Sequence, residues 1–187
     1  MTTNVSDQTV IDKVLAGDTR AFATIMERYA QRVFALVAGM IGDGPDAGDM
    51  TQEIFIKVFS SLSSFKGSSS FSTWLFRISY NMVISSLRRP DSPESAINDE
   101  KFWTGVADNT PDEVDDEDGF LSVDRLYEAL DKLSPDERTL ITLFYLDGKS
   151  LSEIAFIMSL SETNAKTRLF RIRKKLHKII SDGIRQQ

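Results

Sequence analysis

The residues best suited to chemistry lie near the C-terminus, where seven Lys or Arg side chains but only one acid occur between Glu162 and Lys178. If this segment is helical, one side carries an apolar stripe that packs against the rest of its domain: Ala165, Leu169, Ile172, Leu176 and Ile179. The opposite face is mainly polar and basic: Thr163, Lys166, Thr167, Phe170, Arg171, Lys174 and Lys178. A basic helix face suits phosphates, and side chains near its N-terminus can reach base edges. We therefore expect this face to bind DNA, with Lys166 and Arg171 suited to guanine acceptors.

Two shorter helices are predicted before this segment, and each has a sequence signal for its first turn. Ser134 with Glu137, and Ser150 with Glu153, have the spacing of capping boxes, in which side chains satisfy backbone N–H groups at the helix start. The last two helices are separated by a tight turn, and the predicted bounds are 135–146, 151–158 and 162–180. Two helices joined in this way indicate a helix-turn-helix, a motif moderately specific for DNA binding.

The N-terminal half also follows the helical period, in four segments separated by glycine, proline or serine-rich breaks. The breaks fall at Gly17, at 43–45, in the loop 66–70 and at Pro90. The expected core stripes are Val10, Ile11, Val14 and Leu15; Phe22, Ile25, Met26, Tyr29, Val33, Phe34 and Val37; Ile54, Phe55, Val58 and Leu62; and Phe71, Leu75, Ile78 and Met82. No strand-like alternation occurs, so the predicted fold is all-α.

The fourth of these segments carries a second edge with chemical potential. Trp74, Arg77, Asn81 and Arg88 follow one another at steps of three, four and seven residues. An aromatic ring, an amide and two bases on one edge could hold unstacked nucleotides and phosphates. Alternatively, Trp74 belongs to the core and the arginines are merely solvated. Without further evidence, the pattern of this edge favours that second interpretation over nucleic-acid binding.

Charge is distributed unevenly along the chain, and this divides it into two domains. The net charge is −6, but residues 1–92 balance nine acids with nine bases, and residues 123–187 hold nine acids and twelve bases. Residues 93–122 hold ten acids and one base. Clustered acids with proline favour a flexible linker, which we place at 91–119. The expected architecture is two small helical domains, 6–90 and 120–182, and the acidic linker could compete with DNA for the basic helix.

Several strings resemble extracytoplasmic-function (ECF) sigma factors. FSTWLFRISYN, residues 71–81, resembles their promoter-melting segment, and DMTQEIF, residues 49–55, resembles the core-polymerase-binding motif of their second region. LSPDERTLITLFYLDGKSLSEIA and AKTRLFRIRKKL resemble the two halves of their fourth region. The resemblance covers nearly the whole chain in the correct order, and together these motifs are highly specific.

The resemblance implies a role for each candidate residue. Core RNA polymerase would be bound at its clamp coiled coil through Asp49, Gln52, Glu53 and Phe55. The minus-ten element would be read and opened through Lys66, Ser68, Ser69, Trp74, Arg77 and Asn81. The minus-thirty-five element would be read through Thr163, Asn164, Lys166, Thr167, Phe170, Arg171 and Lys174. The fourth region would also contact the polymerase flap, and relatives are usually held inactive by an anti-sigma factor, often membrane-bound.

The chain departs from the family pattern in the turn and at the start of the last helix. Many members have a glycine where Ser159 stands, and Gly-Thr-Val where this chain has Thr163, Asn164 and Ala165. These differences leave the predicted fold intact, but they bear on which promoter bases are read, because Asn164 flanks the reading face.

Composition excludes other kinds of site. Without cysteine there is no disulfide, thiolate zinc site or cysteine nucleophile. The first residues are polar, with no signal peptide expected, and no apolar run approaches the roughly 20 residues of a membrane span. We expect a cytoplasmic protein without a catalytic residue, metal, cofactor or small-molecule substrate.

Two alternatives remain open from the residues alone. An enzyme would rest on carboxylates at helical spacing, Asp43, Asp46, Asp49 and Glu53, which could hold a divalent cation or act as acid and base. The only histidine, His177, lies on the distant basic helix. A transcription regulator that binds DNA alone would use the same C-terminal helices, but it would leave the DMTQEIF motif and the Trp74 edge unexplained.

Overall fold

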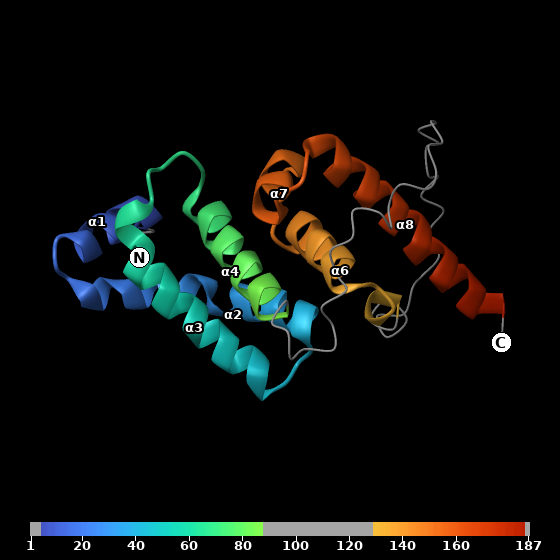
Figure 1. The fold of residues 1–187 in the computed structure, drawn as a ribbon, viewed down its shortest axis with the longest axis horizontal. Helices are drawn as coiled ribbons and strands as arrows, with labels where there is room; N and C mark the ends of the chain where they lie inside the picture. The colour runs from blue at the N-terminus through green and yellow to red at the C-terminus, as the bar shows by residue number, and fades with distance from the viewer. Residues whose placement is uncertain (1–4, 88–128, 186–187) are drawn as a thin grey trace.

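The computed structural model describes residues 5–87 and 129–185, and this part of the chain is helical, with no strand (Figure 1). The N-terminal module, residues 5–87, contains α1 (Asp7–Leu15), α2 (Phe22–Ile41), α3 (Pro45–Ser61) and α4 (Phe71–Leu87), with short 3-10 turns at Thr19–Ala21 and Leu62–Ser64. The C-terminal module, residues 129–185, contains α6 (Pro135–Ile141), a π-helical turn (Thr142–Leu146), α7 (Leu151–Met158) and α8 (Glu162–Arg185). The all-α prediction is confirmed, and the predicted linker 91–119 lies outside the described residues.

The core of the N-terminal module lies between α2, α3 and α4, and most of the predicted stripe residues form it. Ile25, Val33, Ile54 and Val58 are fully buried. Two stripe predictions are wrong: Leu15 is 52% exposed at the end of α1, and Met26 is 42% exposed on α2. Met26 follows the buried Ile25 by about 100° around the helix, so it lies at the border of the buried face.

An aromatic cluster connects the loop 66–70 to the start of α4. The ring of Phe65 lies 5.6 Å from that of Phe71 and 5.4 Å from that of Trp74, and Phe71 also contacts Tyr29 of α2 at 5.7 Å. Such tilted and edge-to-face ring pairs stabilise the fold by more than the burial of their apolar area alone contributes. Burial and a hydrogen bond that the Tyr29 hydroxyl donates to Asp7 raise the pKa of Tyr29. The cluster therefore fixes where the loop ends and α4 begins.

Both predicted capping boxes form in the C-terminal module. The backbone N–H of Glu137 donates to Ser134 Oγ at 3.3 Å, and the Glu137 carboxylate accepts from the Ser134 N–H at 2.8 Å. The Ser150 and Glu153 pair repeats this geometry at 3.2 and 3.0 Å. These reciprocal bonds satisfy N–H groups that have no partner inside the helix, and the predicted starts of both helices are confirmed.

The first helix of this module ends differently from the prediction. Regular α-helix stops at Ile141, and the next five residues form a π-helical turn that ends at Leu146. The N–H of Asp147 then bonds to the carbonyl of Thr142 at 3.1 Å. A π-helical turn is rare and occurs mostly as a single wider turn within a helix. It leaves Leu146 78% exposed, and it places Asp147 against the other module.

The two modules pack against each other. Helix α4 lies against α7, and α2 lies against α6 (Figure 1). As a result α4 is covered by its own module on one side and by the helix-turn-helix on the other, and residues outside the predicted stripe, such as Thr73 and Phe76, are buried. Sequence periodicity predicted one apolar stripe on α4, because a helical pattern does not show that a helix from a distant segment will cover a second side.

The turn between α7 and α8 contains Ser159 in the left-handed region, with φ of 57° and ψ of 41°. The left-handed conformation costs a non-glycine residue roughly 1–2 kcal/mol. Glycine avoids this cost, but its greater conformational freedom in the unfolded chain offsets part of the gain. We predict that Ser159→Gly raises the free energy of unfolding by about 0.5–1 kcal/mol, measured by urea denaturation. Ser152→Gly, in regular helix, should instead lower it by up to about 1 kcal/mol. Equal effects of both substitutions would contradict the prediction.

Candidate nucleic-acid interface

Helix α8 presents the predicted reading face to solvent. Ala165, Leu169 and Ile172 are buried, as the helical stripe predicted. On the other side Thr163, Lys166, Thr167 and Lys174 are exposed, while Asn164, Phe170 and Arg171 are half-buried. The structure therefore brings all seven predicted minus-thirty-five residues onto one helix with its apolar side anchored in the module.

The basic residues of α8 fall into two groups. Arg168 pairs with Asp136 of α6 at 3.9 Å, Arg173 donates to the Tyr145 hydroxyl at 2.8 Å, and Lys175 pairs with Glu137 of α6 at 2.6 Å. These three bases hold the helix to its own module. The predicted reading face keeps Lys166 and Lys174, and the Lys174 ammonium lies 4.6 Å from the centre of the Phe170 ring. This cation–π contact explains why a large apolar ring tolerates the solvent side.

The predicted minus-ten edge lies on α4 and the loop before it. Lys66 and Ser68 are exposed, Ser69 is half-buried, and Asn81 is exposed on α4. Trp74 is half-buried in the aromatic cluster, so the alternative that it belongs to the core holds for part of its ring. Arg88 lies outside the described residues.

One member of this edge is engaged by the C-terminal module. The Arg77 guanidinium donates to the carbonyl of Phe156 on α7 at 3.0 Å, and it lies 4.0 Å from the centre of the Phe156 ring. Arg77 therefore already has a hydrogen-bond acceptor and an aromatic face as partners.

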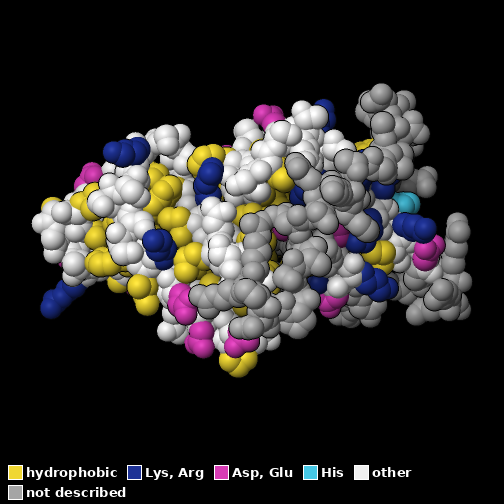
Figure 2. Space-filling model, in the orientation of Figure 1, with side chains coloured by type: hydrophobic (Ala, Val, Ile, Leu, Met, Phe, Trp, Pro, Cys, Tyr) yellow, Lys and Arg dark blue, Asp and Glu magenta, His cyan; other side chains and the backbone are white. Residues whose placement is uncertain are grey.

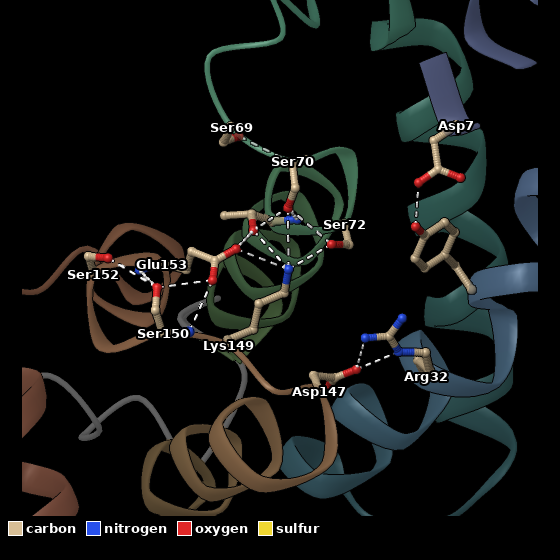
Figure 3. A network of polar contacts seen from close by, with 12 residues as sticks. Asp7, Arg32, Ser69, Ser70, Ser72, Asp147, Lys149, Ser150, Ser152 and Glu153 are labelled. Atoms are coloured by element: carbon tan, nitrogen blue, oxygen red, sulfur yellow. Dashed lines mark hydrogen bonds and ion pairs between the residues drawn. The ribbon is translucent and has the colours of Figure 1, made fainter. Parts of the chain in front are cut away.

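A buried ammonium from the C-terminal module occupies the start of α4 (Figure 3). Lys149 Nζ donates to Ser72 Oγ at 2.6 Å, Thr73 Oγ1 at 2.9 Å and Ser70 Oγ at 3.3 Å. It also pairs with Glu153 at 3.2 Å. Burial raises the pKa of Glu153, but hydrogen bonds from Thr73, Ser150 and Lys149 outweigh it and lower the pKa to about 2.

A third surface lies on α3. Asp49, Gln52 and Glu53 are exposed, as a binding role requires. Phe55 is 4% exposed and packs edge-on against Phe22 at 6.4 Å, so the structure places it in the core and not on this surface. The neighbouring Ile56 is 69% exposed instead. The helical stripe had placed Phe55 in the core, whereas the motif resemblance assigned it to the polymerase surface, because the motif string does not distinguish the two sides of α3.

A groove between α3 and α4 connects this surface to the minus-ten edge. It has a volume of about 400 Å³ and is lined by Met50, Glu53, Lys57, Ile78, Asn81, Met82, Ser85 and Ser86. Glu53 and Asn81, predicted for separate roles, therefore border the same groove. Yellow apolar and dark blue basic side chains both appear on the visible face of the N-terminal module (Figure 2).

The carboxylates of the enzyme alternative form no metal-binding cluster in the described residues. Within 5–87 and 129–185 no group of three or more His, Asp or Glu side chains is placed to hold a metal ion. His177 is exposed on α8. No described helix is long and apolar enough to cross a membrane.

Comparisons with known proteins match both modules. The family described as Sigma-70 region 2 matches residues 25–92, and that described as Sigma-70, region 4 matches residues 124–176. The chain is 34% identical to the ECF RNA polymerase sigma-E factor of Escherichia coli K12, along the whole of both chains. The chain belongs to the ECF sigma-factor family. Sigma factors of this family direct promoter-specific initiation of transcription.

Further relatives agree with this assignment. The sigma factor is 29% identical to the RNA polymerase sigma-H factor of Pseudomonas aeruginosa PAO1, again along both whole chains. Its fold is similar to that of CnrH in complex with the cytosolic domain of CnrY, with a TM-score of 0.66 and 22% identity over 95% of this chain and 99% of that one. It is also similar to RpoE in complex with the anti-sigma factor NepR from Bartonella quintana, with a TM-score of 0.63 and 23% identity over 86% and 96% of the two chains.

Three residues that sequence reasoning missed have defined places in this sigma factor. Ile56 lies exposed beside Gln52 and Glu53 in the α3 sequence, whereas Lys149 and Phe156 connect the modules. Ile56 follows Glu53 by three residues, so its helical position could have indicated the α3 surface. No signal in the sequence indicates the partners of Lys149 and Phe156, because those lie more than 70 residues away.

The lowered pKa of Glu153 predicts a pH-dependent contribution to stability. The folded-state pKa is about 2 and the ordinary value is 4.5, so the contribution is complete above about pH 4.5 and is lost as pH falls through 2. Because the carboxylate is partly exposed, we expect about 1–2 kcal/mol at pH 7. Glu153→Gln keeps capping-box geometry, and urea denaturation should show its deficit shrinking below pH 4.5. A deficit unchanged down to pH 2 would refute this.

Proposed function

We propose that this ECF sigma factor divides promoter recognition among three surfaces, one on each of α3, α4 and α8. The observation that carries the proposal is the exposed polar and basic face of α8, whose apolar side is anchored in a helix-turn-helix module. The family match of the two modules to regions 2 and 4 supports assigning α3 and α4 to polymerase and the minus-ten element.

The α3 surface would bind core RNA polymerase at its clamp coiled coil. Asp49, Gln52 and Glu53 supply exposed polar groups, and Ile56 supplies the apolar contact. An isolated exposed Ile is common on protein surfaces, but a rim of polar groups around a well-exposed apolar side chain is typical of a binding site. Phe55 supports this surface from beneath.

The α4 edge would hold the opened minus-ten strand. Melting costs about 1.4 kcal/mol per base-pair step, and stacking of a base on an aromatic ring returns about 1–3 kcal/mol. The half-buried Trp74 can offer one side of its ring, and Asn81 can offer its amide oxygen as acceptor and its NH2 group as donor to a base edge. Lys66, Ser68 and Ser69 would meet the phosphates. No step of this process requires a catalytic residue.

The α8 face would read the minus-thirty-five element in the major groove. Thr163, Asn164, Lys166 and Thr167 lie in its first two turns, the part of a recognition helix that contacts bases. Phe170, Arg171 and Lys174 follow one turn later. Arg168, Arg173 and Lys175 would position the helix without reading sequence, because their side chains bind Asp136, Tyr145 and Glu137 of the same module.

We place the sigma factor in the cytoplasm, where RNA polymerase works, with domain boundaries at 6–90 and 120–182. An anti-sigma factor is proposed as a further partner, and two proteins of similar fold support it: CnrH in complex with the cytosolic domain of CnrY, and RpoE in complex with the anti-sigma factor NepR. Transcription in vitro with sigma-free core polymerase and a promoter library tests the proposal. We expect start sites at a shared pair of upstream elements, and no start-site selection would refute it.

The assignment of α8 predicts different roles for two arginines of one helix. Arg171→Ala should weaken recognition of the minus-thirty-five element by roughly 1–3 kcal/mol if Arg171 contacts a base. Arg173→Ala removes the same charge from a side chain bound to Tyr145, and should change promoter affinity much less. Binding of polymerase holoenzyme to matched and mutated elements measures both. An equal loss of affinity on matched and mutated elements would instead indicate that Arg171 contacts a phosphate.

The α3 surface predicts that substitution of two neighbouring apolar residues affects different properties, polymerase binding for one and stability for the other. Ile56→Ser should weaken binding to core polymerase about tenfold or more, since buried interface anchors contribute over 1 kcal/mol, while thermal stability stays nearly constant. Phe55→Ser should lower stability by about 3–5 kcal/mol through loss of core packing. Titration with labelled core polymerase and thermal denaturation separate the two effects. Unchanged polymerase affinity of the Ile56 variant would contradict the assignment.

A further inference from the structure

The first turn of α8 holds Asn164 in a fixed position. Its backbone N–H donates to Ser161 Oγ at 3.2 Å, in the manner of an N-cap, and its side chain is half-buried. The first turn is the part of a recognition helix that approaches base edges. Asn164 also stands where many members of the family have threonine, so what its amide does there is particular to this chain.

Arg168 determines which end of the Asn164 amide remains available. The Arg168 Nε–H, one turn further along α8, donates to Asn164 Oδ1 at 3.0 Å. An arginine Nε–H can only donate, so the amide atom that faces it must be the oxygen, and the NH2 group points away from it. In the described part of the chain this NH2 group has no hydrogen-bond partner. The side chain therefore offers two donors, while its acceptor is occupied.

The guanidinium of Arg168 is in turn held by α6. Its Nη1 lies 3.9 Å from Asp136 Oδ2, and the two side chains are only 13% and 15% exposed. A planar guanidinium that has one nitrogen beside a carboxylate and another on an amide oxygen has little freedom to rotate. Asp136 and Arg168 thus keep the oxygen of Asn164 turned away from the groups that its NH2 group can meet.

This orientation decides which DNA groups Asn164 can bind. Asparagine recognises adenine through two bonds, one from its NH2 group to N7 and one from adenine N6 to its amide oxygen. The second bond requires the oxygen that Arg168 holds. A guanine edge presents N7 and O6, and a phosphate presents only oxygens, so both accept without having to donate.

A second donor lies on the same side of α8. Arg171 follows Asn164 by seven residues, two turns along the helix, and a guanidinium can only donate. This flank of the reading face therefore combines two side chains that both require acceptors.

We propose that Asn164 contacts the minus-thirty-five element as a hydrogen-bond donor only, and that Arg168 and Asp136 are the positioning residues that keep it so. The proposal rests on the function assigned to α8 and deepens it. It excludes bidentate recognition of adenine by Asn164, and its DNA partner is an acceptor, either a guanine edge or a phosphate oxygen. It also explains how asparagine can replace threonine here, because a hydroxyl can donate as well.

The first test compares two neutral substitutions in the full-length protein bound to core polymerase. Asn164→Ala removes donor and acceptor together, whereas Asn164→Thr supplies a donor again. Fluorescence anisotropy measures binding of this holoenzyme to promoter duplexes that carry each base in turn at every position of the element. We expect Asn164→Ala to weaken binding about tenfold, and Asn164→Thr to stay within about threefold of the unmodified protein. A threonine variant as weak as the alanine variant would contradict a donor role.

The pattern of the loss identifies the acceptor. A loss confined to elements with guanine at one position assigns Asn164 to a base edge, and an equal loss on every element assigns it to a phosphate. A loss confined to elements with adenine at one position would overturn the proposal, because recognition of adenine needs the amide oxygen.

The positioning role has a readout of its own. Arg168→Met removes the Nε–H and should weaken binding in the unmodified protein, but it should add little to Asn164→Ala, because both changes act through one amide. Fully additive losses would overturn the role of Arg168. Circular dichroism and thermal denaturation verify that each variant is folded, and Asp136→Asn repeats the comparison with a smaller change if Arg168→Met does not fold.

Two further substitutions on the same helix separate this inference from the function on which it rests. If Lys166→Ala and Arg171→Ala weaken binding to the element while Asn164→Ala does not, α8 reads the element and the role of Asn164 is overturned. If none of these variants changes binding, the function assigned to α8 is refuted, and the role of Asn164 falls with it.

Discussion

The ammonium group of Lys149 is inserted between the two modules at the start of α4, where it meets three hydroxyls and one carboxylate. Ser70 serves twice in this arrangement, because its hydroxyl also accepts from the backbone N–H of Thr73 in the first turn of α4. Thr73 likewise donates to Glu153 while it accepts from Lys149. Removing a partner would leave a buried polar group unsatisfied, which costs more than the bond itself contributes. The position of α7 over α4 thus depends on this polar network.

The double burial of α4 explains several features that its sequence alone leaves unconnected. Phe76 and Tyr80 are buried between the modules, whereas Leu75 and Val83 are buried in the N-terminal core. The groove beside α3 and the edge with Asn81 remain open. One helix therefore supports the core, meets the second module and carries a proposed nucleic-acid edge, so the proposed polymerase surface on α3 and the proposed strand-binding edge on α4 share a single support.

The basic residues of α8 divide into those that bind within the module and those that remain for the proposed DNA contact. Arg173 binds the Tyr145 hydroxyl and Lys175 binds the Glu137 carboxylate, and Glu137 also belongs to the capping box that starts α6. Helix α8 is thereby fixed to α6 and to the π-helical turn of its own module. Such anchoring holds the remaining side chains in register, which is what base readout in the major groove requires.

Local rules in the sequence determined the helices, their starts and the reading face. Capping boxes, proline and glycine positions and the 3.6-residue period act over a few neighbours, so Ser134, Ser150 and the stripe from Ala165 to Ile172 could be interpreted without a structure. The motif strings likewise located the α3 surface. They could not separate Phe55 from Ile56, because a string does not show which side of a helix its neighbours cover.

Only the tertiary structure decided the contacts between residues far apart in the chain. Lys149 and Ser72 are 77 residues apart, a separation far longer than that within any local motif. Neither residue type by itself indicates a buried network. The exposure of Met26 and the π-helical turn before Asp147 have the same origin. The physical reason is that periodicity reports an apolar face but not its partner, whereas burial, ion pairing and packing depend on which surface the folded chain brings against it.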